Sequence, residues 1–432
     1  MASLLQDQFL RETELSGKSI STTQFGPAER DLHREIGDFD RSGNSGKFRR
    51  LAILQPVISD YRVPFYRRLA EELAKSAVEL TVIASRPVQE TALRDGIGEL
   101  PFARHIQRTD FGSRNYWQGG PAKFFDFDMV ILQQELRALS NYPVLFCRQA
   151  FGRPGRVGLW GHGTNLHAPY ESSVARTLRW MLNRSADHFF AYTALSRQKF
   201  IDGGADPDRI TVVNNSIDTS DILAESASLE NEQRITRRRE IGLGEGPVGA
   251  FCARLIERKR LPFLVEACRL VRRHIPDFSL LVIGDGPARQ VLKDFDPANE
   301  WIRPVGALYG SDKAKLLCLA DCLCMPFDLG LSILDGFGAG LPVVATRNGS
   351  HGAEIAYLRD GHNGAMSEPS AEAYAAAVID VLENRGRLSE MSRNARGSAQ
   401  EYSLDAMIEN FAAGVLDALD AEKTLEWLAP HR

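Results

Sequence analysis

The sequence predicts an α/β protein with two doubly wound, Rossmann-like domains that face each other across a cleft. Short apolar segments of strand length alternate with helix-like segments along most of the chain, which is typical of parallel βαβ units. A charged stretch at residues 222–246 interrupts this alternation, which then begins again. At 432 residues, the chain is also too long for one ordinary hydrophobic core.

Residues 1–48 are predicted to form a disordered tail, because they are polar, charged and rich in Gly and Ser. A first domain is expected over residues 49–222, with a strand from Leu51 and a helix from Val63, where apolar residues recur at helical spacing. A second helix is expected within residues 171–187. Further strands are predicted at residues 78–85, 127–134, 144–149, 156–163, 188–192 and 210–218.

Residues 223–246 are predicted to form a linking helix between the domains, because they are charged and end in glycines. A second domain is expected over residues 247–400, followed by a C-terminal helix and tail at 401–432 that cross back to the first domain. The strands of the second domain are predicted at residues 247–255, 278–287, 301–308, 322–327 and 342–346, and its helices at 261–274, 313–320, from Gly330 and from Ala371.

The composition is that of a globular protein, with 44% apolar and 25% charged residues. A formal net charge of −4 gives no overall attraction to nucleic acid, so any anion site must be local. The six cysteines are expected to be buried thiols, because so few in a long chain do not form a disulfide framework. No apolar run reaches membrane-spanning length and the N-terminus does not read as a signal peptide, so a cytoplasmic protein is expected.

One glycine-rich segment, residues 328–340, has the residues expected at an anion site. Gly330, Leu331 and Ser332 would open a helix, so their backbone N–H groups would lack partners within it and favour a phosphate. Asp335 follows about one turn later, where its carboxylate could reach the hydroxyls of a sugar attached to that phosphate. The alternative is a structural helix whose later glycines allow close packing and a C-cap.

Two cations, Arg254 and Lys259, follow the first strand of the second domain. They lie past its carboxyl end, where ligands bind in doubly wound sheets. Arg can hold a pair of oxygens while Lys supplies a point charge, so the two suit a diphosphate. The turn at residues 284–287 is expected along the same edge, either as a ligand contact or as a plain strand-to-helix turn.

Several ordered motifs resemble those of family 4 glycosyltransferases, which have the GT-B fold. The segments "ARLIERKRLPFLVEA", "LLVIGDGP", "GLSILDGFGAGLPVVAT" and "NGSHGAEIAYLRDGHNG" resemble the donor-binding domain. "PVISDYRVPFYRRLAEEL", "LWGHGTN", "ADHFFAYT" and "ITVVNNSID" resemble the acceptor-side domain. Each motif alone is weak, but their combination over residues 50 to about 420 is specific. It implies an enzyme that takes its sugar from a nucleotide diphosphate with retention of configuration.

The resemblance assigns roles to residues of the second domain. The family's Arg and Lys that neutralise the donor phosphates match Arg254 and Lys259, and its phosphate-binding helix entry matches Gly330, Leu331 and Ser332. Of two family glutamates eight residues apart, the second, which holds the ribose, matches Asp335. The first, which contacts the sugar, falls at Phe327, so the sugar contacts depart from the family and the neighbouring Asp328 is the substitute. Base recognition corresponds to Leu308 and Tyr309.

In the first domain, His162 lies in a glycine-flanked turn after a strand. The resemblance implies that it contacts the donor sugar near the reacting carbon. A histidine that only caps a turn is the alternative. Tyr61 and Arg62, at the turn after the first strand, are candidate acceptor or phosphate contacts, and a surface role fits them equally well.

No metal or other cofactor is predicted, and the expected partners are the donor and a glycan or lipid-linked acceptor. The pair Asp126 and Asp128 resembles a metal-binding DxD motif, but it precedes a strand instead of following one, so we interpret it as a strand entry. Residues 115–125 are basic and aromatic, and they fit either a peripheral membrane contact or an exposed loop.

The predicted function is a nucleotide-sugar glycosyltransferase in glycan or surface polysaccharide synthesis. Two alternatives stay open. One is a GT-B-fold nucleotide-sugar epimerase, although few of the acid–base residues that it requires are visible. The other is a catalytically silent sugar-nucleotide or glycan-binding protein, which the residue at Phe327 favours.

Overall fold

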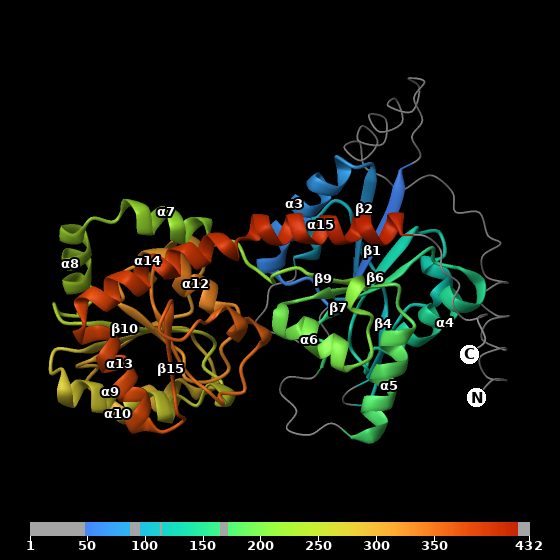
Figure 1. The fold of residues 1–432 in the computed structure, drawn as a ribbon. Helices are drawn as coiled ribbons and strands as arrows, with labels where there is room; N and C mark the ends of the chain where they lie inside the picture. Colours follow the sequence, from blue (N-terminus) through green and yellow to red (C-terminus); the bar gives the residue numbers. More distant parts are fainter. Residues whose placement is uncertain (1–47, 87–95, 113–114, 165–171, 422–432) are drawn as a thin grey trace. The chain divides into compact units, whose positions relative to one another are not determined.

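The computed structural model describes residues 48–86, 96–112, 115–164 and 172–421, and two parallel sheets form its core (Figure 1). The first sheet has the order β3-β2-β1-β6-β7-β8-β9, with every pair parallel. Its strands are β1 (Arg49–Gln55), β2 (Val78–Ala84), β3 (Ala103–His105), β6 (Met129–Gln133), β7 (Val157–Gly161), β8 (His188–Ala191) and β9 (Ile210–Val212).

The helices α3 (Val63–Ala74), α4 (Asn141–Phe151), α5 (Ser173–Arg184) and α6 (Ala194–Asp202) connect the strands of this sheet. The central strands read as continuous apolar runs because both faces of a parallel sheet are covered. For example, every residue of β7 and β8 is buried. The strands β4 (Arg108–Phe111) and β5 (Asn115–Gln118) pair antiparallel and form a separate two-stranded sheet.

The second sheet has the order β12-β11-β10-β13-β14-β15, again with every pair parallel. In chain order this is 3-2-1-4-5-6, so the winding direction reverses between β10 and β13, and ligands of such sheets bind outside the carboxyl ends of the strands at this point. Its strands are β10 (Val248–Cys252), β11 (Ser279–Ile283), β12 (Ile302–Gly306), β13 (Cys322–Cys324), β14 (Val343–Thr346) and β15 (Gly364–Ser367).

The helices of this half are α9 (Leu261–His274), α10 (Gln290–Phe295), α11 (Gly310–Leu317), α12 (Ser332–Gly338), α13 (Ala371–Glu383) and α14 (Arg385–Glu401). The predicted helix at 261–274 agrees with α9 at both ends. Leu261, Leu264, Val265, Cys268 and Val271 are buried on one face of it, which is the spacing that predicts an amphipathic helix.

The C-terminal helix α15 (Leu404–Asp420) returns to the first sheet, as predicted (Figure 1). It contacts α3, β8 and β9. The ring of Phe411 lies 5.4 Å from Phe65, 5.1 Å from Trp160 and 4.5 Å from Phe190, measured between centroids. Together with the two parallel sheets, this crossing helix confirms the predicted doubly wound α/β fold.

One predicted strand is wrong: residues 144–149 belong to helix α4. Val144, Leu145, Cys147 and Arg148 are buried there, whereas Phe146 is 65% exposed, so the burial follows a helical face. A short apolar run does not distinguish a buried strand from a helix. The strands β3, β4, β5 and β15, each of three or four residues, were not predicted.

The charged stretch at 222–246 contains two helices, α7 (Ser220–Ser228) and α8 (Asn231–Glu240), instead of one linking helix. Both are attached to the second sheet. Ile222 lies in its core cluster, and the Arg238 guanidinium, 8% exposed, pairs with Asp321 at 2.8 Å. The charges of this stretch therefore include buried ion pairs as well as solvated surface.

For the aromatic stretch at 115–125, the sequence fitted either a membrane contact or an exposed loop, and the structure excludes the exposed loop. Tyr116 and Phe124 are buried, and the Tyr116 hydroxyl donates to Glu135 at 3.0 Å.

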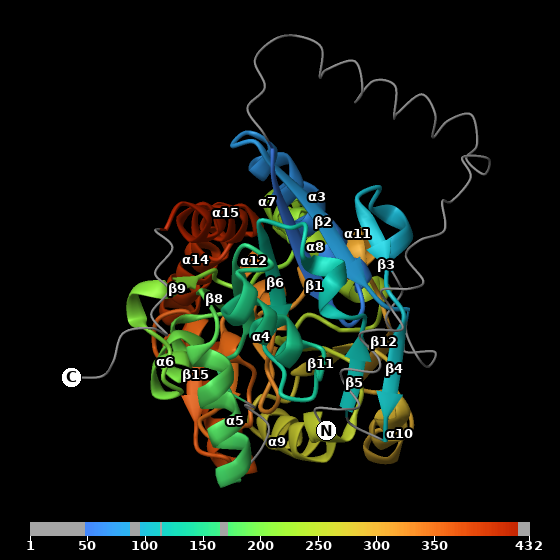
Figure 2. The same cartoon turned by 90° about the vertical axis from the view of Figure 1, so that its right-hand side faces the viewer.

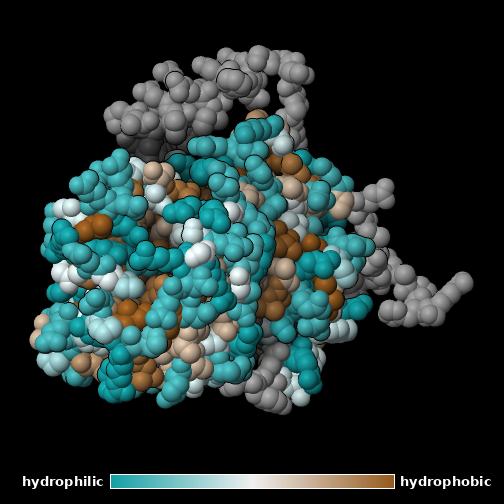
Figure 3. Space-filling view, turned by 60° about the vertical axis from the view of Figure 1, so that its left-hand side comes forward, coloured by the Kyte–Doolittle hydropathy of each residue, from teal (hydrophilic) through white to brown (hydrophobic). Residues whose placement is uncertain are grey.

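On the face drawn in Figure 3, hydrophilic residues cover most of the surface and hydrophobic ones form separate patches. In the described ranges, no helix is both long and apolar enough to cross a membrane, and all six cysteines are free and buried, as predicted.

Candidate donor site at the switch point of the second sheet

The loop after β10 carries Arg254 at the point where the winding of the second sheet reverses. The Arg254 side chain is exposed, and within the described residues no hydrogen bond or ion pair is recorded for its guanidinium. Two glycines of the 284–287 turn support this loop from β11. A Cβ at Gly284, where φ is +153°, would lie 1.9 Å from the Ala253 carbonyl oxygen, so this close backbone approach requires glycine.

The same loop carries Lys259, which reaches across to the segment after β13. Its ammonium donates to the Asp328 carbonyl oxygen and lies 3.2 Å from the Asp328 carboxylate. Both side chains are 11% exposed. Burial lowers the pKa of Lys259, and the Asp328 carboxylate opposes that shift. The carboxyl ends of β10 and β13 are thereby tied together at the edge where doubly wound sheets bind ligands.

Phe327 does not lie where a side chain could contact a sugar. It is 4% exposed, and its ring packs against Phe263 of α9, with centroids 4.9 Å apart. The Arg260 guanidinium lies 4.2 Å from the Phe327 centroid, a cation–π arrangement. At the position that the resemblance assigns to a sugar-binding glutamate, this chain therefore has a packing residue, and the adjacent carboxylate of Asp328 is paired with Lys259.

The turn at residues 329–331 is held in place by His351, which the sequence analysis did not select. The His351 Nδ1 accepts from the Leu329 N–H at 3.1 Å, and its Nε2 lies 2.7 Å from the Thr346 carbonyl oxygen, to which it donates. Burial lowers the pKa of His351, which favours the neutral ring that this pattern of one donor and one acceptor requires. The turn is thus fixed from β14.

The helix that follows this turn, α12, begins two residues after the predicted start at Gly330 and covers the seven residues Ser332–Gly338. No hydrogen bond from the backbone N–H groups of Gly330, Leu331 and Ser332 is recorded among the described residues. These three donors lie directly after Asp328 and its Lys259 partner. Lys259 and the open turn are consequently neighbours.

Asp335 is buried in α12, with 6% of its surface exposed. Its carboxylate pairs with Lys313 of α11, whose ammonium lies 2.8 Å away. Burial raises the pKa of Asp335, and the ammonium opposes that shift. The same helix α11 begins after Tyr309, which is 67% exposed, while Leu308 packs against the core. Helix α11 therefore connects the predicted base contact to the predicted ribose contact.

In the first domain, His162 follows β7 and its ring meets Tyr192 edge-on, with centroids 4.2 Å apart. The Tyr192 carbonyl oxygen lies 3.5 Å from the hydroxyl of Tyr357, a residue of the second half of the chain. His162 therefore lies one residue away from a contact between the two halves. Residues 165–171, which follow this turn, are outside the described residues.

Arg62 is buried, whereas Tyr61 is 43% exposed. The Arg62 guanidinium donates to the Asn215 side chain at 2.6 Å and to the Ser216 carbonyl oxygen at 3.1 Å. Asn215 in turn donates to Glu354 at 2.5 Å. Arg62 thus holds a contact between the halves and is not available at the surface, while Tyr61 stays accessible.

Glu354 is a further site neighbour that the sequence analysis missed. It is 4% exposed, and a Cβ built at Gly352 would lie 2.7 Å from its Oε2. A Cβ at Gly330 would lie 4.0 Å from the same oxygen. The carboxylate therefore lies close to the open turn before α12. The only sequence signal for Glu354 is its place in the motif "NGSHGAEI", and the resemblance assigned no role to this residue.

Two family models match this chain. One, described as glycosyl transferases group 1, covers residues 246–384, and the other, described as glycosyltransferase family 4, covers residues 65–221. Together they span most of both sheets. The chain belongs to the group 1, family 4 glycosyltransferases. The family membership agrees with the resemblance that the motifs indicated.

The sequence identities to individual relatives are low. The chain is 27% identical over 233 residues to a GDP-mannose-dependent phosphatidylinositol monomannoside mannosyltransferase of Mycolicibacterium smegmatis, which is 50% of this chain and 59% of that protein. It is 25% identical over 179 residues to the alpha-monoglucosyldiacylglycerol synthase of Acholeplasma laidlawii, which is 40% of this chain and 44% of that protein. The matches thus span about half the length of these curated relatives.

The fold is shared with solved glycosyltransferase structures. The crystal structure of Anabaena Alr3699/HepE in complex with UDP and glucose superposes with a TM-score of 0.62 at 16% identity. The superposition covers 85% of this family 4 chain and 100% of the Anabaena chain. At this identity the likeness concerns the fold alone, and it confirms the GT-B fold.

Proposed function

We propose that this family 4 glycosyltransferase transfers a sugar from a nucleotide-diphosphate donor to an acceptor hydroxyl, with retention of configuration, in glycan or surface polysaccharide synthesis. The observation that carries the proposal is the pair of cations on one loop at the switch point of the second sheet. Arg254 is exposed there without a recorded partner among the described residues, and Lys259 lies beside the open turn before α12. Two positive charges on one loop are suited to binding the two phosphate groups of a nucleotide diphosphate.

The chemistry of the site follows from the charge that develops during transfer. As the bond between sugar and phosphate oxygen breaks, the leaving diphosphate gains negative charge. In this proposal, Arg254, Lys259 and the N–H groups at Gly330, Leu331 and Ser332 stabilise that charge, and donors that need no reorganisation contribute most. In this scheme the departing phosphate assists attack by the acceptor on the same face, which retains the configuration.

The remaining parts of the donor are assigned by position. Asp335 would accept from the ribose hydroxyls, and Tyr309 with Leu308 would lie against the base. His162 would contact the sugar near the reacting carbon, with Tyr61 on the acceptor side. Because Phe327 is buried, we assign the sugar contact to the carboxylate of the adjacent Asp328, and binding a sugar there requires that it share its Lys259 partner.

Nucleotide binding tests this proposal directly. We expect one of UDP, GDP, ADP and dTDP to raise the melting temperature, because a ligand that binds only the folded state stabilises it by about 2.7 kcal/mol at a hundredfold excess over its dissociation constant. The shift should persist in EDTA, since protein cations serve the phosphates. A shift that EDTA abolishes would contradict the metal-free site. No shift with any nucleotide would favour the catalytically silent binding protein.

The acceptor is proposed to be a lipid-linked molecule at an anionic membrane surface. Both relatives named above act, by their names, on lipids. Helix α5, which follows the His162 turn, has a fitting surface. Val174, Leu178 and Met181 recur at helical spacing and are 69%, 38% and 54% exposed, and Trp180 beside them is 48% exposed.

The charge of α5 is complementary to anionic lipid. The helix contains three arginines and no acidic residue, and Arg176 and Arg184 are exposed. Arg184 lies over the Trp180 ring at 5.0 Å. The C-terminal end of α4 adjoins α5 through a 2.9 Å hydrogen bond from Gln149 to Ser185 (Figure 2). An exposed apolar face with basic flanks is typical of helices that lie in a membrane interface.

Vesicle binding tests this surface. In the double variant Val174→Ser/Met181→Ser, we expect roughly thirtyfold weaker binding to vesicles of phosphatidylcholine with phosphatidylglycerol, since about 1 kcal/mol of apolar burial is lost at each position. Cosedimentation measures this. Ile235→Ser on α8, where the residue is 43% exposed, is the matched control and should bind as the original chain does. Equal binding by all three proteins would contradict the assignment of α5.

A further inference from the structure

A polar pocket lies at the amino ends of the strands of the second sheet, whereas Arg254 lies at their carboxyl ends. It has a volume of about 690 Å³. Its walls come from α7, α8 and α14 and from residues that precede strands, namely Pro247 before β10, Asp321 before β13 and Leu341 before β14. Amino ends of parallel strands share one edge, so this pocket is separate from the donor site at the carboxyl ends.

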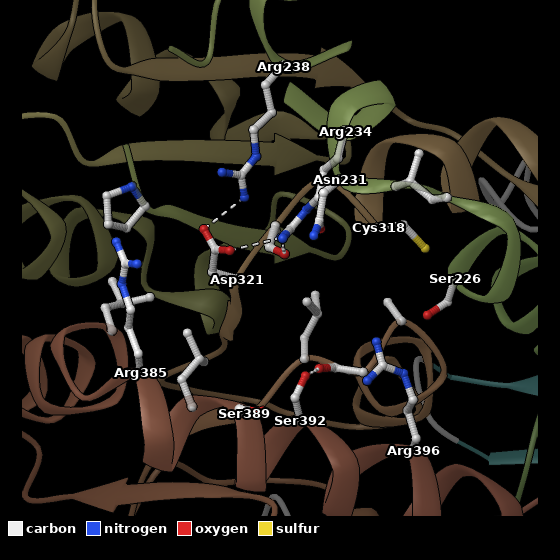
Figure 4. Close-up of a pocket in the computed structure, with 18 of the residues that line it drawn as sticks. Ser226, Asn231, Arg234, Arg238, Cys318, Asp321, Arg385, Ser389, Ser392 and Arg396 are labelled. Atoms are coloured by element: carbon white, nitrogen blue, oxygen red, sulfur yellow. Dashed lines mark hydrogen bonds and ion pairs between the residues drawn. The ribbon is translucent and has the colours of Figure 1, made fainter. Parts of the chain in front are cut away.

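Arginine is the most frequent residue type in the wall of this pocket (Figure 4). Five arginines line it, together with the carboxylates of Asp321 and Glu245, so the lining has an excess of three positive charges. Glu245 pairs with Arg239, which is not a lining residue. The lining arginines are Arg234, Arg238, Arg385, Arg393 and Arg396.

The α8 side of the pocket is already neutralised in part. Arg234 and Arg238 both pair with Asp321, at 2.9 and 2.8 Å. Two guanidinium groups share this one carboxylate, and the Arg238 side chain is 8% exposed. Burial lowers the pKa of Arg238 and the carboxylate opposes that shift. This side therefore retains a net positive charge in a poorly solvated position.

On the α14 side of the pocket, the described residues include no acid that pairs with the lining arginines. Among the described residues no carboxylate lies within 4 Å of Arg385, Arg393 or Arg396, although Arg387 on the same helix pairs with Asp380. In Figure 4, Arg385 and Arg396 extend from α14 towards the space opposite Arg234 and Arg238. The hydroxyls of Ser226 and Ser389 lie on the same lining. Guanidinium groups thus approach one pocket from two sides.

We propose that this pocket binds a small molecule with two or more phosphate groups, or groups of equal charge. Guanidinium forks match the oxygen pairs of phosphate, and the volume lies in the range of small-ligand sites. Groups that approach from two helices suit a ligand with charges at both ends better than a single anion. An extended polyanion such as nucleic acid would need an open basic surface, whereas this site is a concave pocket in one domain.

Binding of inorganic pyrophosphate and tripolyphosphate to the full chain, measured by calorimetry at constant ionic strength, tests this inference. The test variant is Arg385→Gln/Arg396→Gln, because both side chains are exposed and have no recorded ion pair. Arg387→Gln is the matched control on the same helix, outside the pocket. Arg254→Ala removes a cation of the proposed donor site instead. Thermal melting of each variant verifies that it is folded.

We expect the double variant to lose at least tenfold in tripolyphosphate affinity, while Arg387→Gln and Arg254→Ala retain this site. Loss of all binding in Arg254→Ala alone would assign the anion to the donor site and overturn the inference. An equal loss of tripolyphosphate affinity in Arg387→Gln would overturn the inference, because binding would then reflect only the general positive charge of this surface. Undiminished binding in the double variant overturns it as well. Because Arg254 is tested separately, the inference can fail while the proposed transferase activity holds.

Discussion

Replacing Arg254 by alanine is expected to lower kcat/KM about a hundredfold, because a lost donor at a developing oxyanion costs about 3 kcal/mol. The substrate is the nucleotide sugar whose nucleotide raises the melting temperature, and the readout is transfer or, without an acceptor, hydrolysis of the donor. The folded state should be unaffected, since the guanidinium is exposed and has no recorded partner among the described residues.

Arg258→Ala is the matched control for this prediction. Arg258 belongs to the same loop and carries the same charge, but its side chain is 59% exposed and lies 3.6 Å from Asp328. We expect less than a threefold change, as for most exposed ion pairs. Equal losses in both variants would indicate a general electrostatic effect of the loop. Unchanged activity in Arg254→Ala would remove Arg254 from the phosphate site.

Most of the fold could be predicted because buried parallel strands are continuous apolar runs that alternate with helices. The error at residues 144–149 shows the limit of this signal. Helix α4 buries Arg148, which binds Asp187 through two hydrogen bonds of 2.8 and 2.9 Å, and it exposes Phe146. A local apolar pattern cannot reveal that a distant carboxylate makes an arginine a core residue.

The site could be predicted only where its residues lie in short motifs. Arg254 and Lys259 follow a strand, and their placement at the switch point follows from topology. Lys313 and His351 were missed, because each meets its partner from 22 positions away in the sequence. Neither has a local pattern that predicts this contact. The role of Phe327 likewise became clear only when its partner Phe263 was known.

The pairing of Lys313 with Asp335 makes a second large effect predictable. Asp335→Ala is expected to lower the free energy of unfolding by about 3 kcal/mol, because it leaves a largely buried ammonium without its counter-charge. The Lys313 side chain is 20% exposed and the Asp335 side chain 8%. Urea unfolding measures this loss. If the effect were only structural, nucleotide binding would recover whenever stability does.

The double variant Lys313→Met/Asp335→Ala separates these two roles. Removing both charges should restore most of the stability, since apolar replacements of buried ion pairs are often neutral. Nucleotide affinity should nevertheless remain roughly thirtyfold lower, because a hydrogen bond from the ribose to a carboxylate contributes about 2 kcal/mol. Recovery of both properties would make Asp335 a structural partner of Lys313 alone. Recovery of stability without affinity would place the ribose at the second acidic position of the family motif, where this chain has aspartate in place of glutamate.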